Sequence, residues 1–272
     1  MLDQRKYVVS IAGLDPSAGA GLLADVKCFE QHQIYGFGVC SALTVQTDET
    51  FIAVQWLSAD QIIAQLTPLL AKFELAAVKI GLIRDLGVLE TVVNFIRTVD
   101  EKLPLVLDPV LSASAGFNFH NWNANELVGI LKQINLITPN YSEMKHLAKH
   151  DAAESAAAEW ATYCPVLLKG GHNPDAKGTD LLFKTPVEIV SFDPVTDLIY
   201  EKHGSGCVLS SAIAANLAQG HTIEEACSLA KAYTAQFLNS SSTLLGYHHV
   251  QQASLEHPSL QMPYLSSSGK ID

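Results

Sequence analysis

The chain has 272 residues, the length of one large domain or two small ones. Hydrophobic residues make up 48% of it and charged residues 17%, which excludes the class of disordered proteins. Its 28 acidic and 17 basic side chains give a net charge of -11. Because non-specific nucleic-acid binding needs a basic surface, we expect no nucleic-acid partner.

Short apolar runs alternate with helix-like segments along the chain. Strands are predicted, in chain order, at Tyr7–Ala12, Gly38–Val45, Leu75–Ile80, Leu105–Leu107, Leu136–Thr138 and Val166–Lys169, followed by a hairpin of Asp180–Lys184 and Val187–Phe192. Helices are predicted at Leu22–Gln33, Ala59–Phe73, Leu86–Val99, Ala124–Lys132, Ser142–Lys149, Ala152–Tyr163, Cys207–Gln219 and Thr222–Asn239. This alternation indicates an α/β fold with a mostly parallel sheet, which binds ligands beyond the carboxyl ends of its strands.

The rest of the sequence bears on domains and location. We predict a single domain over residues 1–253 and a loosely held tail, rich in Ser and Pro, over 254–272. Residues 1–10 contain no apolar stretch of signal-peptide length, and no window approaches the roughly 18 apolar residues of a membrane span. The five cysteines are scattered, which favours a reducing compartment. We therefore predict a cytoplasmic protein with no membrane partner.

The first glycine-rich segment, residues 13–21, follows the first predicted strand and leads into the first helix. Its end matches the dinucleotide-binding pattern GxGxxG/A, but the glycines come too late after the strand, and no carboxylate stands at the tip of the next one. A loop that brings backbone close to a small ligand fits better. Asp15 could supply an acceptor there or act as a turn residue before Pro16. Asp25 could likewise be an acceptor or lie on a solvated helix face.

The second glycine-rich segment, residues 203–207, precedes a helix that is apolar or small on all sides and is therefore predicted to be buried. The first N–H groups of a buried helix lack intrahelical partners, and glycines before it let them converge on an anion. Such a site suits the transfer of a phosphoryl group, although a glycine-rich helix cap is the structural alternative. Cys207 lies in the first helical turn, where the helix dipole is expected to lower its pKa.

Seven segments together resemble the ribokinase-like superfamily and, within it, the hydroxymethylpyrimidine/phosphomethylpyrimidine kinases of thiamine biosynthesis. They are AGLDPSAGAGLLADVK (12–27), VQT (45–47), VKIGLI (78–83), VLDPVL (106–111), LITPNYSE (136–143), LLKGGH (167–172) and HGSGC (203–207). The resemblance implies a three-layer sandwich with a mostly parallel central sheet flanked by helices. It also implies a homodimer, ATP and Mg²⁺ as cofactors, and phosphorylation of 4-amino-5-hydroxymethyl-2-methylpyrimidine and then of its monophosphate.

The resemblance also assigns residues to the site. The substrate side would comprise Gly13, Asp15, Gly21, Asp25, Gln46, Lys79 and Val110, with Gln46 hydrogen-bonded to the aminopyrimidine. The nucleotide side would comprise Asn140, Lys169 and Asp180, with Glu143 positioning Mg²⁺ through water. The catalytic group would comprise Gly204, Ser205 and Gly206 as the anion hole, together with Cys207 and Lys169.

Residue chemistry agrees with several of these assignments but leaves alternatives. The Gln46 amide both donates and accepts, as an aminopyrimidine requires, though it could be an exposed strand-end residue. Lys169 ends an apolar strand before two glycines, where it could meet a phosphate or only extend its ammonium toward water. Glu143 is a suitable oxygen ligand for Mg²⁺ and also fits as the third residue of a helix capped by Asn140.

Some positions depart from the family pattern, and rival functions remain. Ala18 replaces a glycine and slightly restricts its loop, and Val208 replaces a residue with a hydroxyl. A pyridoxal kinase of the same lineage is the nearest rival. Residues 111–116 contain no cysteine, which favours the pyrimidine as substrate over pyridoxal. These residues also begin a flap that is predicted over 111–119. A homologue that binds ligand without catalysis is a second rival.

Overall fold

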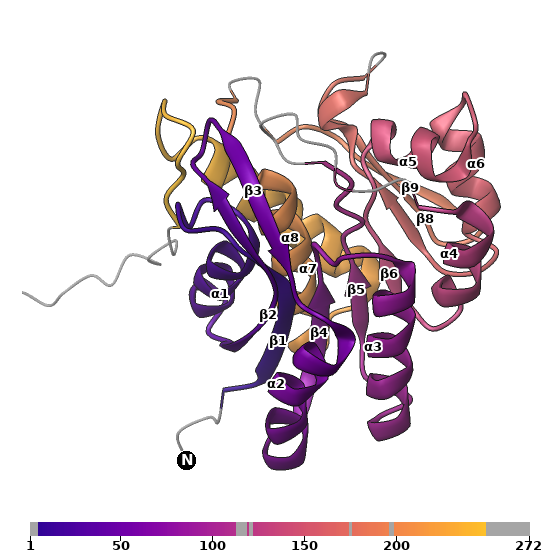
Figure 1. Cartoon of the computed structure of the whole chain (residues 1–272). Coiled ribbons are helices and arrows are strands. Elements are labelled where there is room, and N and C mark those ends of the chain that lie inside the picture. Colours follow the sequence, from indigo (N-terminus) through magenta and orange to yellow (C-terminus); the bar gives the residue numbers. More distant parts are fainter. Residues whose placement is uncertain (1–4, 113–118, 120–121, 174–175, 196–198, 249–272) are drawn as a thin grey trace, which may run out of the picture.

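The computed structural model describes residues 5–112, 119, 122–173, 176–195 and 199–248. A nine-stranded sheet in the order β3-β2-β1-β4-β5-β6-β7-β8-β9 runs across the molecule (Figure 1). Its strands are β1 Tyr7–Leu14, β2 Tyr35–Gln46, β3 Phe51–Trp56, β4 Leu75–Ile80, β5 Leu105–Leu107, β6 Leu136–Ile137, β7 Val166–Leu168, β8 Asp180–Phe183 and β9 Ile189–Phe192. The helices are α1 Gly21–Gln31, α2 Ala59–Lys72, α3 Leu86–Val99, α4 Ala124–Leu131, α5 Tyr141–Ala148, α6 Ala153–Trp160, α7 Ser205–Ala218 and α8 Ile223–Leu238.

The central strands of the sheet are parallel. Strands β2, β1, β4, β5, β6 and β7 pair in parallel, whereas β3, β8 and β9 join antiparallel at the two ends. The predicted mostly parallel sheet is therefore confirmed, as is the predicted hairpin near the C-terminal edge. All six parallel strands place their carboxyl ends along one edge, which is where the sequence motifs meet.

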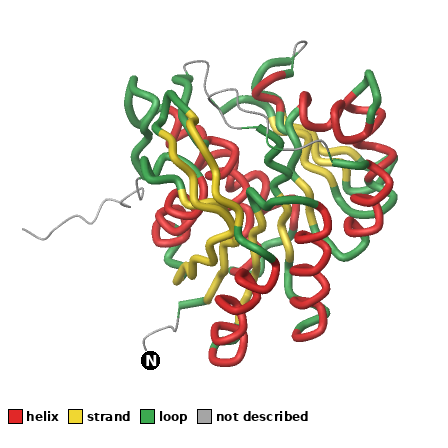
Figure 2. The backbone as a smooth tube through the Cα atoms, in the orientation of Figure 1, coloured by secondary structure: helices red, strands yellow, loops and turns green. Residues whose placement is uncertain are grey.

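Helices cover both faces of the sheet (Figure 2). On one face, α1 and α8 pack against α7, which also contacts β1, β4 and β5. Helix α7 is buried over almost its whole length, as its lack of a polar face predicts. On the other face, the apolar sides of α2, α3, α4, α5 and α6 form a second core. This three-layer arrangement confirms the predicted fold class.

The main error in the predicted elements is β3, which the sequence reading leaves out. Its residues are half-buried or exposed, none is buried, and Ile52 is 70% exposed. Because β3 is an edge strand, it is held mainly by pairing with β2 and carries little of the core signal that identifies a strand in sequence. The missed pairing also explains why β2 runs on to Gln46, beyond the predicted end of that strand.

Two predicted segments lie largely or wholly outside the described residues. They are the tail over 254–272 and most of the flap predicted over 111–119. At the end of the latter, Phe119 packs edge-on against Phe51, with ring centroids 5.0 Å apart. Within the described part of the chain, none of the helices has the length and apolar character needed to cross a membrane.

Arg97 at the end of α3 joins that helix to the loops around β5 and β6. Its guanidinium donates to the carbonyl oxygens of Asp100, Glu101, Leu103 and Gln133 and to the side chain of Asn135. Since Arg97→Ala leaves several of these acceptors without partners, we expect the free energy of unfolding to fall by about 2–4 kcal/mol. Urea denaturation of both proteins measures the change.

Arg84→Ala is the matched control for this prediction. The Arg84 guanidinium makes one exposed ion pair, 2.7 Å from the Asp85 carboxylate. Exposed pairs of this kind contribute about 0–1 kcal/mol, so this substitution should change stability little. Equal losses in the two variants would contradict the role assigned to Arg97.

Candidate active site

The two glycine-rich segments meet at the carboxyl edge of the sheet. Gly204 has φ +77°, and a Cβ there would lie 2.2 Å from the Gly19 carbonyl oxygen. Gly21 has φ +57°, and its Cβ would lie 2.3 Å from the Gly13 carbonyl oxygen. Both positions need glycine for its left-handed backbone and for the close approach. The two loops are therefore in direct backbone contact.

The helices that begin in these two loops lack side-chain caps. The N-cap residues, Ala20 of α1 and Gly204 of α7, provide no side-chain hydrogen bond to the first turn of their helix. Capping side chains are present in α2, α3, α4, α5 and α8. The first turns of α1 and α7 therefore offer backbone N–H groups and positive dipole ends at the same place, a suitable environment for an anion.

Cys207, in the first turn of α7, does not have the lowered pKa that its position suggested. Burial raises the pKa of its thiol to about 11; the charge of Lys79 and the N–H of Gly21 lower it, while the charges of Asp108 and Asp25 raise it. The expectation of a thiolate was therefore wrong, because desolvation and two carboxylates outweigh the helix dipole. At neutral pH Cys207 is a thiol.

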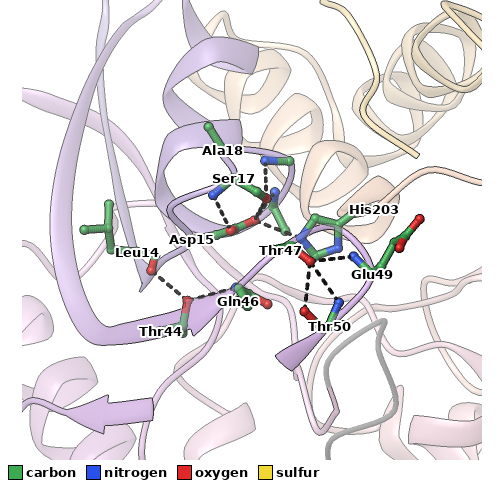
Figure 3. A network of polar contacts seen from close by, with 12 residues as sticks. Leu14, Asp15, Ser17, Ala18, Thr44, Gln46, Thr47, Glu49, Thr50 and His203 are labelled. Carbon is green, nitrogen blue, oxygen red and sulfur yellow. Dashed lines mark hydrogen bonds and ion pairs between the residues drawn. The ribbon is translucent and has the colours of Figure 1, made fainter. Parts of the chain in front are cut away.

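Asp15 is bonded to its own loop and to His203 (Figure 3). Its carboxylate accepts hydrogen bonds from the N–H and hydroxyl of Ser17, each at 2.9 Å, and from the N–H of Ala20 at 2.9 Å. The Nε2 atom of His203 lies 2.8 Å from the same carboxylate. Burial would raise the pKa of Asp15, but the hydrogen bonds of His203, Ser17 and Ala20 outweigh it and hold the pKa below its usual value.

Asp15 therefore serves as a turn residue and also joins the two glycine-rich segments. Within the turn, Ala18 adopts φ +56°, a conformation that glycine favours. Alanine is therefore less free than glycine at this position, because the turn requires a left-handed backbone there. The N–H of His203 also donates to the Leu244 carbonyl oxygen at 2.9 Å, which connects the junction to the segment that follows α8.

Gln46 stands at the end of β2, beside this junction (Figure 3). Its Nε2 donates to the Thr44 hydroxyl at 2.9 Å, and that hydroxyl donates to the Leu14 carbonyl oxygen at 2.8 Å. The side chain is half-buried. These bonds fix the orientation of the amide. Among the described residues, no hydrogen bond to its carbonyl oxygen is present, so that atom is available to a ligand.

Lys169, directly after β7, lies between two buried carboxylates. Its Nζ is 2.7 Å from the Asp108 carboxylate and 3.7 Å from that of Glu143. Burial opposes the charge of Lys169, but the two carboxylates outweigh it and raise its pKa. Burial would also raise the pKa of Asp108, but the charges of Lys169 and Lys79 keep it below its usual value. Burial raises the pKa of Glu143, despite the opposing charge of Lys169.

The ammonium of Lys169 also approaches the first turn of α7, because a Cβ on Gly206 would lie 3.3 Å from its Nζ. One cation and the uncapped turn of α7 therefore share one end of the site. Ser205 and Gly206 are half-buried in that turn, and Val110, whose N–H donates to the Asp108 carbonyl oxygen at 2.8 Å, is also half-buried. The structure thus brings together the residues predicted to form the anion hole and Lys169.

Asn140 and Glu143 form a reciprocal helix cap at the start of α5. The Asn140 side chain accepts from the Glu143 N–H at 2.9 Å, and the Glu143 carboxylate accepts from the Asn140 N–H at 2.7 Å. The capping alternative considered for Glu143 is thus present. The same carboxylate lies 3.7 Å from the Lys169 ammonium, so the cap also fixes the position of Glu143 beside that lysine.

Three predicted site residues lie beneath the surface rather than facing a ligand. Asp25 and Lys79 are 0% exposed and bond each other at 2.7 Å. Asp180 accepts from the Gly170 N–H at 2.6 Å and from the Lys231 ammonium at 2.8 Å, so both of its oxygens are occupied. The side chains of these residues support the site from within, and none presents an unpaired polar atom to it.

Sequence reasoning missed several residues that build the site, listed here with their partners: Asp108 with Lys169, His203 with Asp15, and Ser210 and Ser211 with Asp108 and Asp25. The sequence held some signal for Asp108 and for the two serines. Asp108 is a carboxylate directly after a buried strand, and the two serines are polar residues in a helix that is otherwise apolar. Their partners depend on strand order, which spacing alone does not supply.

The family model described as phosphomethylpyrimidine kinase matches residues 15–252 of the chain. The hydroxymethylpyrimidine/phosphomethylpyrimidine kinase of Salmonella typhimurium is 34% identical over 251 residues, which cover 89% of this chain and 94% of that protein. The chain belongs to the phosphomethylpyrimidine kinase family. This membership confirms the resemblance drawn from the seven sequence segments, and the kinase is accordingly a phosphotransferase.

Solved structures agree with this family. The phosphomethylpyrimidine kinase of Clostridium difficile superimposes with a TM-score of 0.71 at 29% identity, and the match covers 85% of the present chain and 99% of the Clostridium chain. The pyridoxal kinase of Staphylococcus aureus in complex with ADP gives a TM-score of 0.79 at 24% identity, and the match covers 92% of the present chain and 96% of the Staphylococcus chain. The second likeness supports the ribokinase-like fold alone.

Proposed function

We propose that the kinase transfers the γ-phosphoryl group of ATP to the hydroxymethyl group of 4-amino-5-hydroxymethyl-2-methylpyrimidine, and then to the resulting monophosphate, in thiamine biosynthesis. The observation that carries this proposal is the uncapped first turn of α7 beside the Lys169 ammonium. Backbone N–H groups and one fixed cation suit a phosphoryl group in transfer. The family supplies the pyrimidine as acceptor.

The residues divide into two sides around this turn. The pyrimidine would bind against the 13–21 loop, with its amino edge at the amide of Gln46. The nucleotide would lie along Asn140 and Lys169, whose ammonium attracts the phosphates. The substrate hydroxyl would then attack the γ-phosphorus in line, ADP would leave with the bridging oxygen, and the hydroxyl proton would pass to solvent, while N–H groups of Gly206 and Cys207 hold the transferred oxygens. Because such transition states are loose, they need positioning and charge stabilisation more than a strong base, so a protonated Cys207 can orient the hydroxyl.

The carboxylates of the site fit Mg²⁺ only in part. Hydrogen bonds from Lys169, Thr138 and Ser210 occupy the Asp108 carboxylate, whereas one oxygen of Glu143 accepts no hydrogen bond from the described residues. No group of three potential metal ligands occurs among those residues. Glu143 would therefore hold Mg²⁺ through water, with nucleotide phosphates as the other ligands. When bound, Mg²⁺ neutralises phosphate charge.

The oligomeric state and the cellular location of the kinase are two further proposals. We propose that it is a homodimer, as the family resemblance implies. We also propose that it works in the reducing cytoplasm, because all five cysteines are free and three of them, Cys28, Cys164 and Cys227, are buried. Size-exclusion chromatography with light scattering tests the first of these proposals.

One experiment tests the proposed substrate. Steady-state phosphorylation of the hydroxymethylpyrimidine, its monophosphate and pyridoxal would be compared side by side with ATP and Mg²⁺. We expect both pyrimidines to react with a higher kcat/KM than pyridoxal. A preference for pyridoxal would replace the proposal with the rival kinase activity, and no turnover of any acceptor would favour a binding protein.

Gln46→Ala tests the pyrimidine side of the site. Loss of the oriented amide removes one or two hydrogen bonds to the aminopyrimidine, so its Kd should rise by about five- to tenfold, with ATP affinity unchanged. Isothermal titration calorimetry with each ligand measures both constants. Gln55→Ala on the exposed part of β3 is the matched control and should leave both constants unchanged. An unchanged pyrimidine Kd in Gln46→Ala would remove Gln46 from the binding site.

A further inference from the structure

A buried ion pair beneath α7 has no role in the proposed contacts with substrate. The Asp25 carboxylate on α1 and the Lys79 ammonium on β4 are 2.7 Å apart, and neither side chain is exposed. The hydroxyls of Ser10 on β1 and Ser211 on α7 donate to the same carboxylate, at 2.5 and 2.7 Å. Asp25 therefore joins two strands and two helices, with its oxygens already bonded to protein.

The pair lies directly under the catalytic turn. Ser211 comes four residues after Cys207 in α7, which places both side chains on one face of the helix, one turn apart. The preceding Ser210 donates to the Cys207 carbonyl oxygen at 3.0 Å and to the Asp108 carboxylate at 3.1 Å. Two adjacent serines thus anchor the first turns of α7 to two different buried carboxylates.

Each of these carboxylates has a lysine partner, and all four charges act near the Cys207 sulfur. Asp25 pairs with Lys79, and Asp108 pairs with Lys169. Interactions with the Cys207 thiol arise from Lys79 on β4, Asp108 after β5, Asp25 on α1 and Lys169 after β7. Since Lys169 also faces the Glu143 carboxylate, the two lysines meet three carboxylates, and the thiol meets no net positive charge. Removing one member of a pair would leave the other uncompensated in a medium that screens it weakly.

We propose that Asp25 is a positioning residue that holds the first two turns of α7 through Ser211 and cancels the charge of Lys79 beneath Cys207. A thiolate at this place would set a negative charge beside the N–H groups that must hold phosphoryl oxygens. It would also be the reactive form toward oxidants and alkylating agents. Burial already disfavours that charge, and the Asp25 carboxylate adds to the effect by offsetting Lys79.

The charge part of the proposal is tested by alkylation of Cys207 with iodoacetamide between pH 6 and pH 10, followed by peptide mass spectrometry. Asp25→Asn leaves Lys79 without its partner, and we expect Cys207 to react about tenfold faster at pH 8.5 than in the wild type. Lys79→Gln leaves Asp25 without its partner and should slow the reaction. The double variant should return toward the wild-type rate. Glu90→Gln, which removes one exposed carboxylate from α3, should have no effect.

Opposite signs for the two single variants distinguish a charge effect from loosened packing, which would speed alkylation in both. Equal rates in Asp25→Asn and the wild type, or faster alkylation in both single variants, would overturn the charge part. Where one single variant fails to fold, as judged by circular dichroism, the sign of the other decides.

The positioning part rests on the proposed function, because it is measured as kcat for the pyrimidine. Ser211→Ala removes one hydrogen bond to Asp25 and keeps both charges. It should lower kcat about threefold or more with KM for ATP and the alkylation profile unchanged. A wild-type kcat would overturn the positioning part. If the wild type itself phosphorylates no pyrimidine, the proposed function fails while the alkylation result still stands.

Discussion

Gly204→Ala is expected to lower kcat by about 100-fold or more, the loss typical when donors to a developing charge are displaced. Gly204 adopts φ +77°, and an alanine Cβ would lie 2.2 Å from the Gly19 carbonyl oxygen and 2.7 Å from Cα of Ala20. Since these contacts are with backbone, the two loops must separate. The N–H groups at the start of α7 then move away from the transferred phosphoryl group and from Lys169. Steady-state kinetics with the pyrimidine and ATP measure the loss.

Gly220→Ala is the matched control for this substitution. Gly220 follows the other end of α7 and also has a positive φ, +95°, but nothing lies within 4 Å of where its Cβ would stand. Alanine there should cost about 1 kcal/mol of stability through backbone strain, with kcat unchanged. If both variants lost activity equally, strain in α7 rather than contact between the loops would be the cause, and the role assigned to Gly204 would be wrong.

Much of the fold could be predicted because its signals are local. Apolar runs mark the buried strands, and the helix after Cys207 was identified as buried from its composition alone. Strand β3 was not predicted, because an exposed edge strand lacks the apolar run that marks a buried strand. The starts of α1 and α7 lie slightly earlier than predicted, since a glycine in a left-handed or uncapped position gives little indication of where a helix begins.

The site could be predicted only as far as single residues reveal their chemistry. Gln46, Lys169, Glu143 and the turn before Cys207 stand at the sheet edge where the motifs placed them. The partners that set their charge were not predictable, because they come from distant segments. Asp15 meets His203 across 188 positions, and Asp25 meets Ser211 across 186. Burial of such pairs reversed the expected pKa of the Cys207 thiol, because a helix dipole is weaker than desolvation and two carboxylates.

Lys169→Met is expected to lower the free energy of unfolding by about 3–5 kcal/mol, because it leaves the buried Asp108 carboxylate without its main partner. The variant should also lose about 100-fold or more in kcat, since the phosphates lose the cation beside α7. Urea denaturation and steady-state kinetics measure the two effects. Lys184→Met is the control, because the Lys184 ammonium pairs with Glu188 and Glu224 at the surface and contributes about 0–1 kcal/mol.

The stability loss in Lys169→Met is expected to depend on pH in a definite direction. In the wild type the pKa of Asp108 is below its usual value, so its contribution to stability is present above about pH 4 and is lost as the pH falls further. Without Lys169, burial is expected to raise the pKa of Asp108, and the folded state is then penalised increasingly as the pH rises above about 4. The stability difference between wild type and Lys169→Met should therefore be smaller at pH 5 than at pH 8. Adding Asp108→Asn to Lys169→Met should reduce this dependence to the share of Glu143, whose carboxylate also loses the charge of Lys169. A difference between wild type and Lys169→Met that stayed constant with pH would show that the lysine stabilises the fold by packing rather than by charge.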